Sequence, residues 1–252
     1  MAKWEILEID PYLSDYENDI NLRMERLEEQ KKKFLSAGNS LKEFANAHNY
    51  YGFHKVKGGW IYREWAPNAD GLYLIGDFNN WDKHSHPLTK INNEDWEIFV
   101  KGVRTIPHKS RLKVLVDAGG RILERIPLFA RRVERNEDLD FAAVLENPRR
   151  DFEWTDQDFK IKNKDLLIYE AHIGMAGEEG EVSTYKHFEK NILPRIKKAG
   201  YNTVQLMAIS EHPYYGSFGY QVANFFAPSS WYGESKDLKS LINTAHEMGL
   251  NV

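Results

Sequence analysis

The spacing of apolar residues changes twice along the chain, and each change marks a different kind of structure. From residue 15 to about residue 37 the apolar residues recur at helical spacing among charges: Ile20, Met24, Leu27, Phe34 and Leu35. This spacing predicts an amphipathic helix that Gly38 ends, followed by a short helix over residues 41–48. Residues 1–10 predict a short extended segment that stops at Asp10-Pro11.

From about residue 51 to residue 146 the apolar period shortens to that of strands. Short apolar runs alternate with turns rich in Gly, Asn and Pro, and the predicted strands cover residues 60–65, 72–75, 96–101, 112–117 and 121–126. Short strands at such spacing predict an all-β sandwich of roughly a hundred residues. A polar linker over residues 148–165 follows it.

After residue 165 strands and helices alternate. We expect a strand over 166–169, a helix that Ser183 caps and Gly200 ends, a buried strand over 204–209, a helix from Ser235 to Gly249, and a third strand at 250–252. Pro194 removes one amide donor, so it predicts a kink or a late helix start. The expected domains are therefore a helical segment (1–50), a sandwich (51–147), a linker (148–165) and an α/β segment (166–252).

This alternation is the pattern of a parallel α/β sheet. A (β/α)8 TIM barrel typically takes about 250 residues, so residues 166–252 are too short to close one. We therefore expect the first β/α units of a truncated barrel; a smaller open fold is the alternative.

The stretch 201–230 combines a buried strand with a long loop dense in aromatic residues. The loop contains Tyr214, Tyr215, Phe218, Tyr220, Phe225 and Phe226. Long loops with this much aromatic surface at the carboxyl end of a strand are usually functional. Flat apolar faces edged by hydroxyls suit sugar rings; the alternative is that the aromatic residues belong to the core.

Composition narrows the class of protein. The 252 residues have a net charge of −4, with 34 Lys and Arg against 38 Asp and Glu, and they include no cysteine. Nothing here indicates a nucleic-acid or membrane partner, a disulfide or a cysteine-based metal site. The amino terminus has no signal-peptide pattern and no apolar run could span a bilayer, so we expect a cytoplasmic protein. The 7 Trp, 13 Tyr and 13 Phe favour a carbohydrate ligand or a bulky core.

Several ordered motifs resemble the glycogen and starch branching enzymes of the α-amylase superfamily. They are IYEAHIG (168–174), STYKHF (183–188), the run from Leu193 to Ser230 that contains QLMAISEHPYYGSFGY, and DLKSLINTAHEMGLNV (237–252). Upstream, YREWAPNADGLYLIGDFNNWD (62–82), IPHKSRLKV (106–114) and ERIPLFARRV (124–133) resemble the carbohydrate-binding module that precedes the barrel in that family. The resemblance covers essentially the whole chain.

The resemblance implies a reaction but no catalytic residue in this chain. Branching enzymes cleave an α-1,4-glucan and transfer the segment to a 6-hydroxyl, and such retaining chemistry needs two carboxyl groups about 5–5.5 Å apart. In the family these carboxylates follow a motif that would begin just beyond Val252. We therefore expect the 252-residue chain alone to be inactive. The resemblance implies no cofactor, His84 and His86 give only a weak metal signal, and the sequence leaves the oligomeric state undetermined.

By the same resemblance, substrate binding falls on named positions. Tyr220 matches the tyrosine that stacks under the sugar at the cleavage subsite, with Tyr215 and His212 as weaker candidates; a capping role is the alternative for His212. Trp65 and Trp81 match glucan-holding aromatic residues, with a core role as the alternative. A glucan groove is implied over Trp65, Ala66 and Pro67 and the loop 92–95, near Asn39, with Asn92, Asn93 and Asp95 as its polar residues.

Two further readings compete with a branching enzyme. A debranching hydrolase pairs the same kind of module with a barrel, but the SEHPYYGSFGY run argues against it. A stand-alone glucan-binding protein without catalysis is the third possibility.

Overall fold

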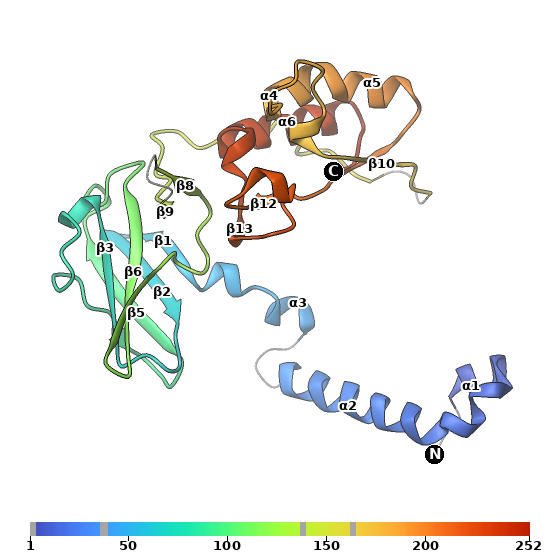
Figure 1. Ribbon diagram of the computed structural model, residues 1–252, viewed down its shortest axis with the longest axis horizontal. Helices are drawn as coiled ribbons and strands as arrows, with labels where there is room; N and C mark the ends of the chain where they lie inside the picture. Colours follow the sequence, from blue (N-terminus) through green and yellow to red (C-terminus); the bar gives the residue numbers. More distant parts are fainter. Residues whose placement is uncertain (1–3, 36–39, 137–139, 162–164) are drawn as a thin grey trace. The chain divides into compact units, whose positions relative to one another are not determined.

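The computed structural model describes residues 4–35, 40–136, 140–161 and 165–252 (Figure 1). The chain divides into two compact units, Met1–Tyr50 and Tyr51–Val252, which we describe separately.

The first unit is helical. It contains α1 (Glu5–Ile9), a 3₁₀ helix (Pro11–Tyr16), α2 (Glu17–Leu35), α3 (Leu41–Phe44) and a 3₁₀ turn (Ala47–Asn49). The predicted long helix is confirmed as α2, and the short helix as α3 and the turn after it. The predicted extended segment at residues 1–10 is wrong for its described part, because residues 5–9 are helical.

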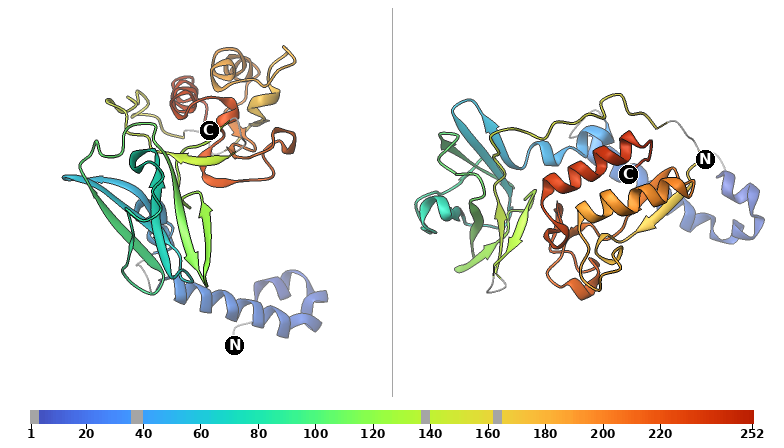
Figure 2. Two further views of the ribbon diagram at one scale, coloured as in Figure 1. Left: turned by 60° about the vertical axis from the view of Figure 1, so that its left-hand side comes forward. Right: turned by 90° about the horizontal axis from the view of Figure 1, so that it is seen from above.

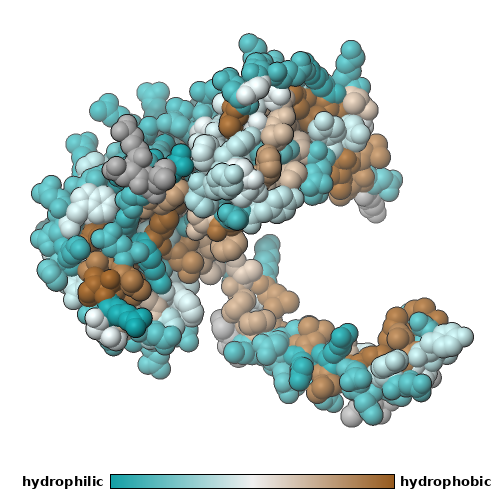
Figure 3. All heavy atoms as spheres, in the orientation of Figure 1, coloured by the Kyte–Doolittle hydropathy of each residue, from teal (hydrophilic) through white to brown (hydrophobic). Residues whose placement is uncertain are grey.

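Contacts within the first unit explain this helix. Leu7 is buried, and the Trp4 indole Nε1 donates to Asn21 Oδ1 on α2 at 2.7 Å. The Asp10 carboxylate accepts from the Tyr12 amide at 3.1 Å and so separates α1 from the next turn. A five-residue helix is unstable alone, so this tertiary packing rather than local pattern determines its shape. Along α2, Leu22, Leu27 and Leu35 stay exposed, and Figure 3 shows brown apolar atoms along these helices.

The second unit begins with the predicted sandwich, which is confirmed. One antiparallel sheet has the order β1 (Gly52–Val56), β2 (Gly59–Trp65), β5 (Asp95–Lys101), β4 (Thr89–Lys90). The other has the order β3 (Gly71–Gly76), β6 (Arg111–Ala118), β9 (Phe141–Val144), β8 (Val133–Arg135), with β7 (Arg121–Arg125) paired to β6. The five predicted strands correspond to β2, β3, β5, β6 and β7.

Alternating residues of the two sheets form the core between them. Tyr62 on β2, Leu74 on β3, and Leu112 and Val114 on β6 are fully buried in one cluster. Strand residues point alternately to opposite faces, so the polar residues between them face outward. The strands that the sequence did not predict, β1, β4, β8 and β9, are short.

The rest of the second unit alternates strands and helices. Parallel strands β10 (Ile168–Ala171) and β11 (Thr203–Leu206) pair from Ile168 opposite Thr203, and Asn251 forms a parallel bridge to Thr203 on the far side. Between β10 and β11 lie α4 (Tyr185–His187), a π-helical turn (Phe188–Ile192) and α5 (Leu193–Lys198); α6 (Ser235–Glu247) precedes Asn251. Figure 2 shows α5 and α6 side by side.

Local details differ from expectation for identifiable reasons. Thr184, not Ser183, caps α4, because the Thr184 hydroxyl accepts from the His187 amide at 3.1 Å. The break that Pro194 predicts is present as the π-helical turn before α5. Strand β11 ends at Leu206, earlier than predicted, and Ala208 has a positive φ of 55° that extended chain does not allow.

Helices cover one side of this small parallel sheet, and residues at its β10 edge are exposed. Val204, Phe188, Ile196 and Leu241 share a buried cluster under the helices. By contrast, Leu167, Ile168 and Tyr169 around β10 are exposed.

The predicted linker is partly docked on α6. The Asp156 carboxylate contacts His246 Nδ1 at 2.5 Å, and the Phe159 ring stacks on the His246 ring with centroids 4.0 Å apart. The Thr155 amide donates to Asn243 Oδ1 at 2.8 Å. Residues 155–159 therefore follow the helix surface.

A second strand pair fastens the α/β segment to the sandwich. In β13 (Asn224–Pro228), which pairs with β12 (Ser210–Glu211), Asn224 Nδ2 donates to the carbonyls of Pro127 and Leu128 at 3.4 and 3.5 Å. The ring of Phe226 stacks on Phe129 at 4.3 Å, and Ala227 joins the sandwich core. The two parts of this unit thus share apolar surface.

Candidate functional site

Trp65 ends β2 and presents an indole ring to solvent. The residue is 42% exposed, and its Nε1 donates to Glu94 Oε2 at 3.2 Å. The Ala66 amide donates to the Glu94 carbonyl at 2.8 Å, and the Trp96 indole donates to the Ala66 carbonyl at 2.9 Å. These bonds tie the segment after β2 to the loop before β5, so the exposed ring sits on a fixed base.

The loop beside Trp65 is shaped by its own polar side chains. Asn92 Oδ1 accepts from the amides of Glu94 and Asp95 at 2.8 and 2.7 Å, while its Nδ2 donates to Asp95 Oδ2 at 2.7 Å. The Tyr51 hydroxyl donates to Asp95 Oδ1 at 2.6 Å. Asp95 is buried, so its carboxylate holds the loop in place, while Asn92, Asn93 and Glu94 stay exposed.

The buried carboxylate of Glu64 stabilises the backbone around Trp65. Glu64 accepts from the Tyr62 hydroxyl, from Arg125 Nη2 at 2.8 Å and from the Leu128 amide at 3.2 Å. Arg125 Nη2 also donates to the Trp65 carbonyl at 2.9 Å. Burial raises the pKa of Glu64, while Arg125 beside it acts in the opposite direction. This network fixes the backbone from which Trp65 projects.

We call Trp65, Pro67 and residues 92–95 the Trp65 patch. An aromatic face binds the apolar face of a sugar ring, and neighbouring amides and carboxylates bind its hydroxyls. The structure brings together five of the predicted residues here: Trp65, Pro67, Asn92, Asn93 and Asp95. Sequence reasoning missed Glu94 and Tyr51, whose roles depend on contacts across strands. Asn39 lies outside the described residues.

Trp81 lies apart from the Trp65 patch, after β3 of the other sheet. Its indole Nε1 donates to Asp77 Oδ1 at 3.1 Å, and Lys113 Nζ sits over its ring, 6.0 Å from the centroid. The ring is half-buried. Any ligand of Trp81 would therefore bind to a different face of the sandwich.

The aromatic loop after β11 contains the other predicted residues. His212 is fully buried, and its Nδ1 donates to the Ser210 carbonyl at 3.0 Å. Its Nε2 has no partner among the described residues. Tyr215 is half-buried, and both rings pack near Trp231, with centroids 6.3 and 5.5 Å away.

Tyr220 belongs to the same loop but points into solvent. It is 76% exposed. The preceding residue, Gly219, has a positive φ of 85° and lies so close to Ala208 that a Cβ would not fit there. The structure therefore groups His212 and Tyr215 around Trp231 and leaves Tyr220 free to contact a ligand.

His172, directly after β10, joins this aromatic group and was not among the predicted residues. Its Nε2 lies 3.1 Å from the Tyr232 hydroxyl, and its Nδ1 accepts from the Met175 amide at 3.2 Å. Burial lowers the pKa of His172. Parallel strands place functional residues at their carboxyl ends, and His172 occupies that position.

Buried polar groups next to this loop have structural partners. Glu211 accepts from the Ser230 amide at 2.8 Å, and burial raises its pKa. Across the described residues, no group of three His, Asp or Glu side chains gathers that could hold a metal ion. None of the helices there has the length and apolar character needed to cross a membrane.

Comparison with known proteins places these features in context. Residues 50–130 match the family model of carbohydrate-binding module 48, the isoamylase N-terminal domain. The chain is 42% identical to the 1,4-alpha-glucan-branching enzyme of Dictyostelium discoideum and 43% identical to that of Emericella nidulans, over 98% of its own length and 37% of theirs. It is 41% identical to 1,4-alpha-glucan-branching enzyme 2-2 of Arabidopsis thaliana, over 98% of this chain and 32% of that protein.

Solved structures share the fold at lower identity. A pullulanase from Bacillus acidopullulyticus aligns over 79% of this chain and 28% of its own with a TM-score of 0.63 at 19% identity. The type I pullulanase of Bacillus subtilis, complexed with maltose, aligns over 79% of this chain and 32% of its own with a TM-score of 0.62 at 19% identity. Over nearly its whole length the chain is therefore similar to about a third of the length of these 1,4-alpha-glucan-branching enzymes, and its residues 50–130 match carbohydrate-binding module 48.

Proposed function

We propose that this chain is the front portion of a cytoplasmic 1,4-alpha-glucan-branching enzyme and that it binds the glucan substrate. The complete enzyme would cleave an α-1,4-glucan and transfer the segment to a 6-hydroxyl. The single observation that carries the binding role is the Trp65 patch, a solvent-exposed indole on a rigid base edged by Asn92, Asn93 and Glu94. Its ligand would be an α-1,4-glucan or a maltooligosaccharide.

The α/β segment would be the first part of the catalytic barrel. Two parallel strands, a third parallel bridge at Asn251 and helices on one face are the repeating unit of a (β/α)8 barrel. In such a barrel the exposed β10 residues Ile168 and Tyr169 would be covered by further strands and helices of the barrel.

Within that barrel start, Tyr220 would stack on the sugar at the cleavage position. Its exposed ring supports this role, since a stacking residue needs a free face. His212 Nε2, buried without a partner among the described residues, would be satisfied by substrate or by a later part of the barrel. The two carboxyl groups that retaining chemistry needs would come from the part of the relatives that this chain does not match.

A debranching enzyme is the less favoured reading. The pullulanase likeness is at 19% identity and concerns the fold, whereas the likeness to branching enzymes reaches 42% over nearly every residue.

Binding of maltoheptaose to the 252-residue chain, measured by calorimetry, tests the proposal. Trp65→Ala should weaken binding by about tenfold, since one aromatic–sugar stack contributes on the order of 1–1.5 kcal/mol. Trp154→Ala is the matched control, because Trp154 is 37% exposed and lies outside the sandwich. Equal affinity of both variants and the parent chain would contradict the Trp65 patch as the glucan site.

A second experiment tests whether the 252-residue chain has catalytic activity of its own. Amylose incubated with the 252-residue chain alone should keep its iodine colour, because the chain would lack the catalytic carboxylates. Loss of colour would show that catalysis resides within these residues.

A further inference from the structure

A second polar surface lies at the other end of the β2–β5 pair. Lys55, Arg104, His108 and Arg149 line a hollow of about 630 Å³ together with Asn147 and the apolar side chains of Val103, Pro107 and Pro148. No carboxylate lines this hollow among the residues that the structure describes. On a protein with a net charge of −4, this is a local surplus of positive charge.

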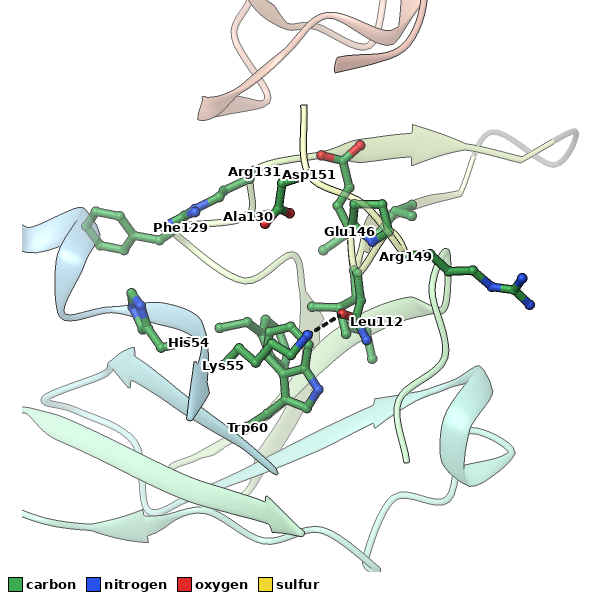
Figure 4. Close-up of a pocket in the computed structure, with 16 residues that line it drawn as sticks. His54, Lys55, Trp60, Leu112, Phe129, Ala130, Arg131, Glu146, Arg149 and Asp151 are labelled. Atoms are coloured by element: carbon green, nitrogen blue, oxygen red, sulfur yellow. Dashed lines mark hydrogen bonds between the residues drawn. The ribbon is translucent and has the colours of Figure 1, made fainter. Parts of the chain in front are cut away.

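Hydrogen bonds around Asn147 organise the hollow. The Asn147 amide donates to His108 Nδ1 at 3.0 Å, its Nδ2 donates to the Val103 carbonyl at 3.1 Å, and its Oδ1 accepts from Lys55 Nζ at 3.4 Å. Figure 4 shows a cavity that adjoins the hollow and draws the Lys55–Asn147 bond. The Arg149 side chain extends away from that cavity. One asparagine thus connects β1, the loop after β5 and the segment after β9.

The same bonds leave the hollow rich in donors. Because His108 Nδ1 accepts a hydrogen bond, a neutral His108 must carry its proton on Nε2, which is then a donor. Lys and Arg side chains have only donors, and the Asn147 side-chain oxygen is already occupied by Lys55. A ligand that fits this set must be rich in acceptors.

The neighbouring charges do not cancel this surplus. Glu146 lines the adjoining cavity of about 390 Å³, and its carboxylate contacts Arg132 Nη1 at 3.3 Å. Asp151 also lines that cavity and not the hollow. Lys109, next to His108, contacts Glu234 at 2.9 Å. Lys55 and Arg149 line both spaces, whereas Arg104 lines the hollow and not the cavity of Glu146 and Asp151.

We propose that this hollow binds the phosphate group of a phosphorylated sugar. Arginine and lysine are the side chains that bind phosphate oxygens. The volume of the hollow far exceeds that of a phosphate ion, and the apolar side chains of Val103, Pro107 and Pro148 offer contact to a sugar ring beside it. The phosphate half of the proposal stands on the hollow alone; the sugar half rests on the proposed function.

Phosphorus NMR titrations of the 252-residue chain test the proposal with three probes: inorganic phosphate, glucose 6-phosphate, and unphosphorylated glucose as competitor. Glucose 6-phosphate should bind several-fold more tightly than inorganic phosphate, and glucose alone should not displace it. Equal affinity for the two phosphates would overturn the sugar half. If neither inorganic phosphate nor glucose 6-phosphate binds, the proposed site is overturned.

Substitutions locate the site. Arg104→Gln and Arg149→Gln should each weaken glucose 6-phosphate binding about threefold and together about tenfold, since exposed ion pairs contribute modestly. Both residues are exposed, so thermal melting should be unchanged. Arg121→Gln removes an exposed arginine from β7, outside the hollow, and should have no effect. An equal loss in Arg121→Gln, or none in the double variant, would refute the location.

The outcome is separable from that of the proposed function. Trp65→Ala should weaken maltoheptaose binding about tenfold and keep glucose 6-phosphate binding. The Arg104→Gln, Arg149→Gln double variant should weaken glucose 6-phosphate binding about tenfold and keep maltoheptaose binding. Loss of both ligands in either variant would contradict two independent sites.

Discussion

The two ends of the β2–β5 pair carry opposite chemistry on one scaffold. Trp65 pairs with Asp95 at one end, and Gly59 pairs with Lys101 at the other; six residue steps along a strand separate them by about 20 Å. The first end has an aromatic ring among carboxylates and amides, and the second has cations. A buried core shared by both ends leaves the loops free to differ, so one sandwich can recognise two ligands.

The largest expected effect concerns the support of the Trp65 patch. Glu64→Ala should lower the free energy of unfolding by about 1–3 kcal/mol, because it leaves the buried Tyr62 hydroxyl without its acceptor, while Arg125, which is 39% exposed, becomes hydrated. Urea denaturation measures the change. Glu97→Ala is the control: Glu97, which pairs with Arg63 at 2.6 Å, is 30% exposed against 2% for Glu64, so its loss should cost less than about 1 kcal/mol. Similar losses in both variants would contradict a special role for Glu64.

A smaller effect should follow from releasing the loop before β5. Tyr51→Phe removes the donor to Asp95 Oδ1, and a hydrogen bond to a charged group contributes about 1.5–3 kcal/mol. We expect a loss of stability near the lower end and weaker maltoheptaose binding, with unchanged glucose 6-phosphate binding. Tyr220→Phe, on an exposed ring, should leave stability unchanged. A stability loss without any change in maltoheptaose binding would separate the loop from the glucan site.

Near the hollow, the carboxylate of Glu234 forms ion pairs with several cations. It contacts Lys109 at 2.9 Å, Arg132 at 3.7 Å and Lys236 at 2.7 Å. Hydrogen bonds from Lys236 and Lys109 lower the pKa of Glu234 to about 2. A carboxyl group with a depressed folded-state pKa stabilises the protein above its unfolded pKa of about 4.3 and loses that contribution as the pH falls toward 2.

The acid dependence of Glu234→Gln measures this contribution. Since the side chain is about one-third exposed, screening reduces the expected stabilisation to about 1 kcal/mol at pH 7. The difference in unfolding free energy between parent and variant should shrink as the pH is lowered from 5 toward 2. A difference that is constant with pH would refute the assignment.

The smallest expected effect is the change in ligand affinity with salt concentration at the two ends of the β2–β5 pair. Raising sodium chloride from 50 to 500 mM should weaken glucose 6-phosphate binding about threefold, because exposed charges are screened over a shorter distance. Maltoheptaose is neutral, so its affinity should change little. Equal salt dependence of the two ligands would remove the contrast between the two ends.

Sequence pattern predicted the regular elements well where local signals were strong. Helix α2 has apolar residues at helical spacing at Ile20, Met24 and Leu27, and β2 and β6 are apolar runs between clear turns. It failed where an element depends on distant contacts: α1 depends on packing against α2, and β8 and β9 are only three and four residues long. The α4 cap differed by one residue, because two neighbouring hydroxyl residues offer the same local signal.

The residues of the candidate sites show the same difference between local sequence signals and distant contacts. Trp65 could be named because it lies in a contiguous motif, whereas Glu64, Glu94 and Tyr51 became relevant only through bonds between separate strands and loops. The hollow could not be read from the chain, since Lys55 and Asn147 are 92 positions apart.

The residue pattern alone was enough to predict the order of helices, sandwich and α/β segment, the resemblance to branching enzymes and the aromatic character of the candidate sugar site. These depend on residue types and near-neighbour spacing, which a linear chain displays directly. The folded structure was needed to show which cations line the hollow, which of them pair with a carboxylate, and which aromatic rings are exposed. Electrostatic compensation and burial depend on distances between residues far apart in the chain, and folding alone establishes those distances.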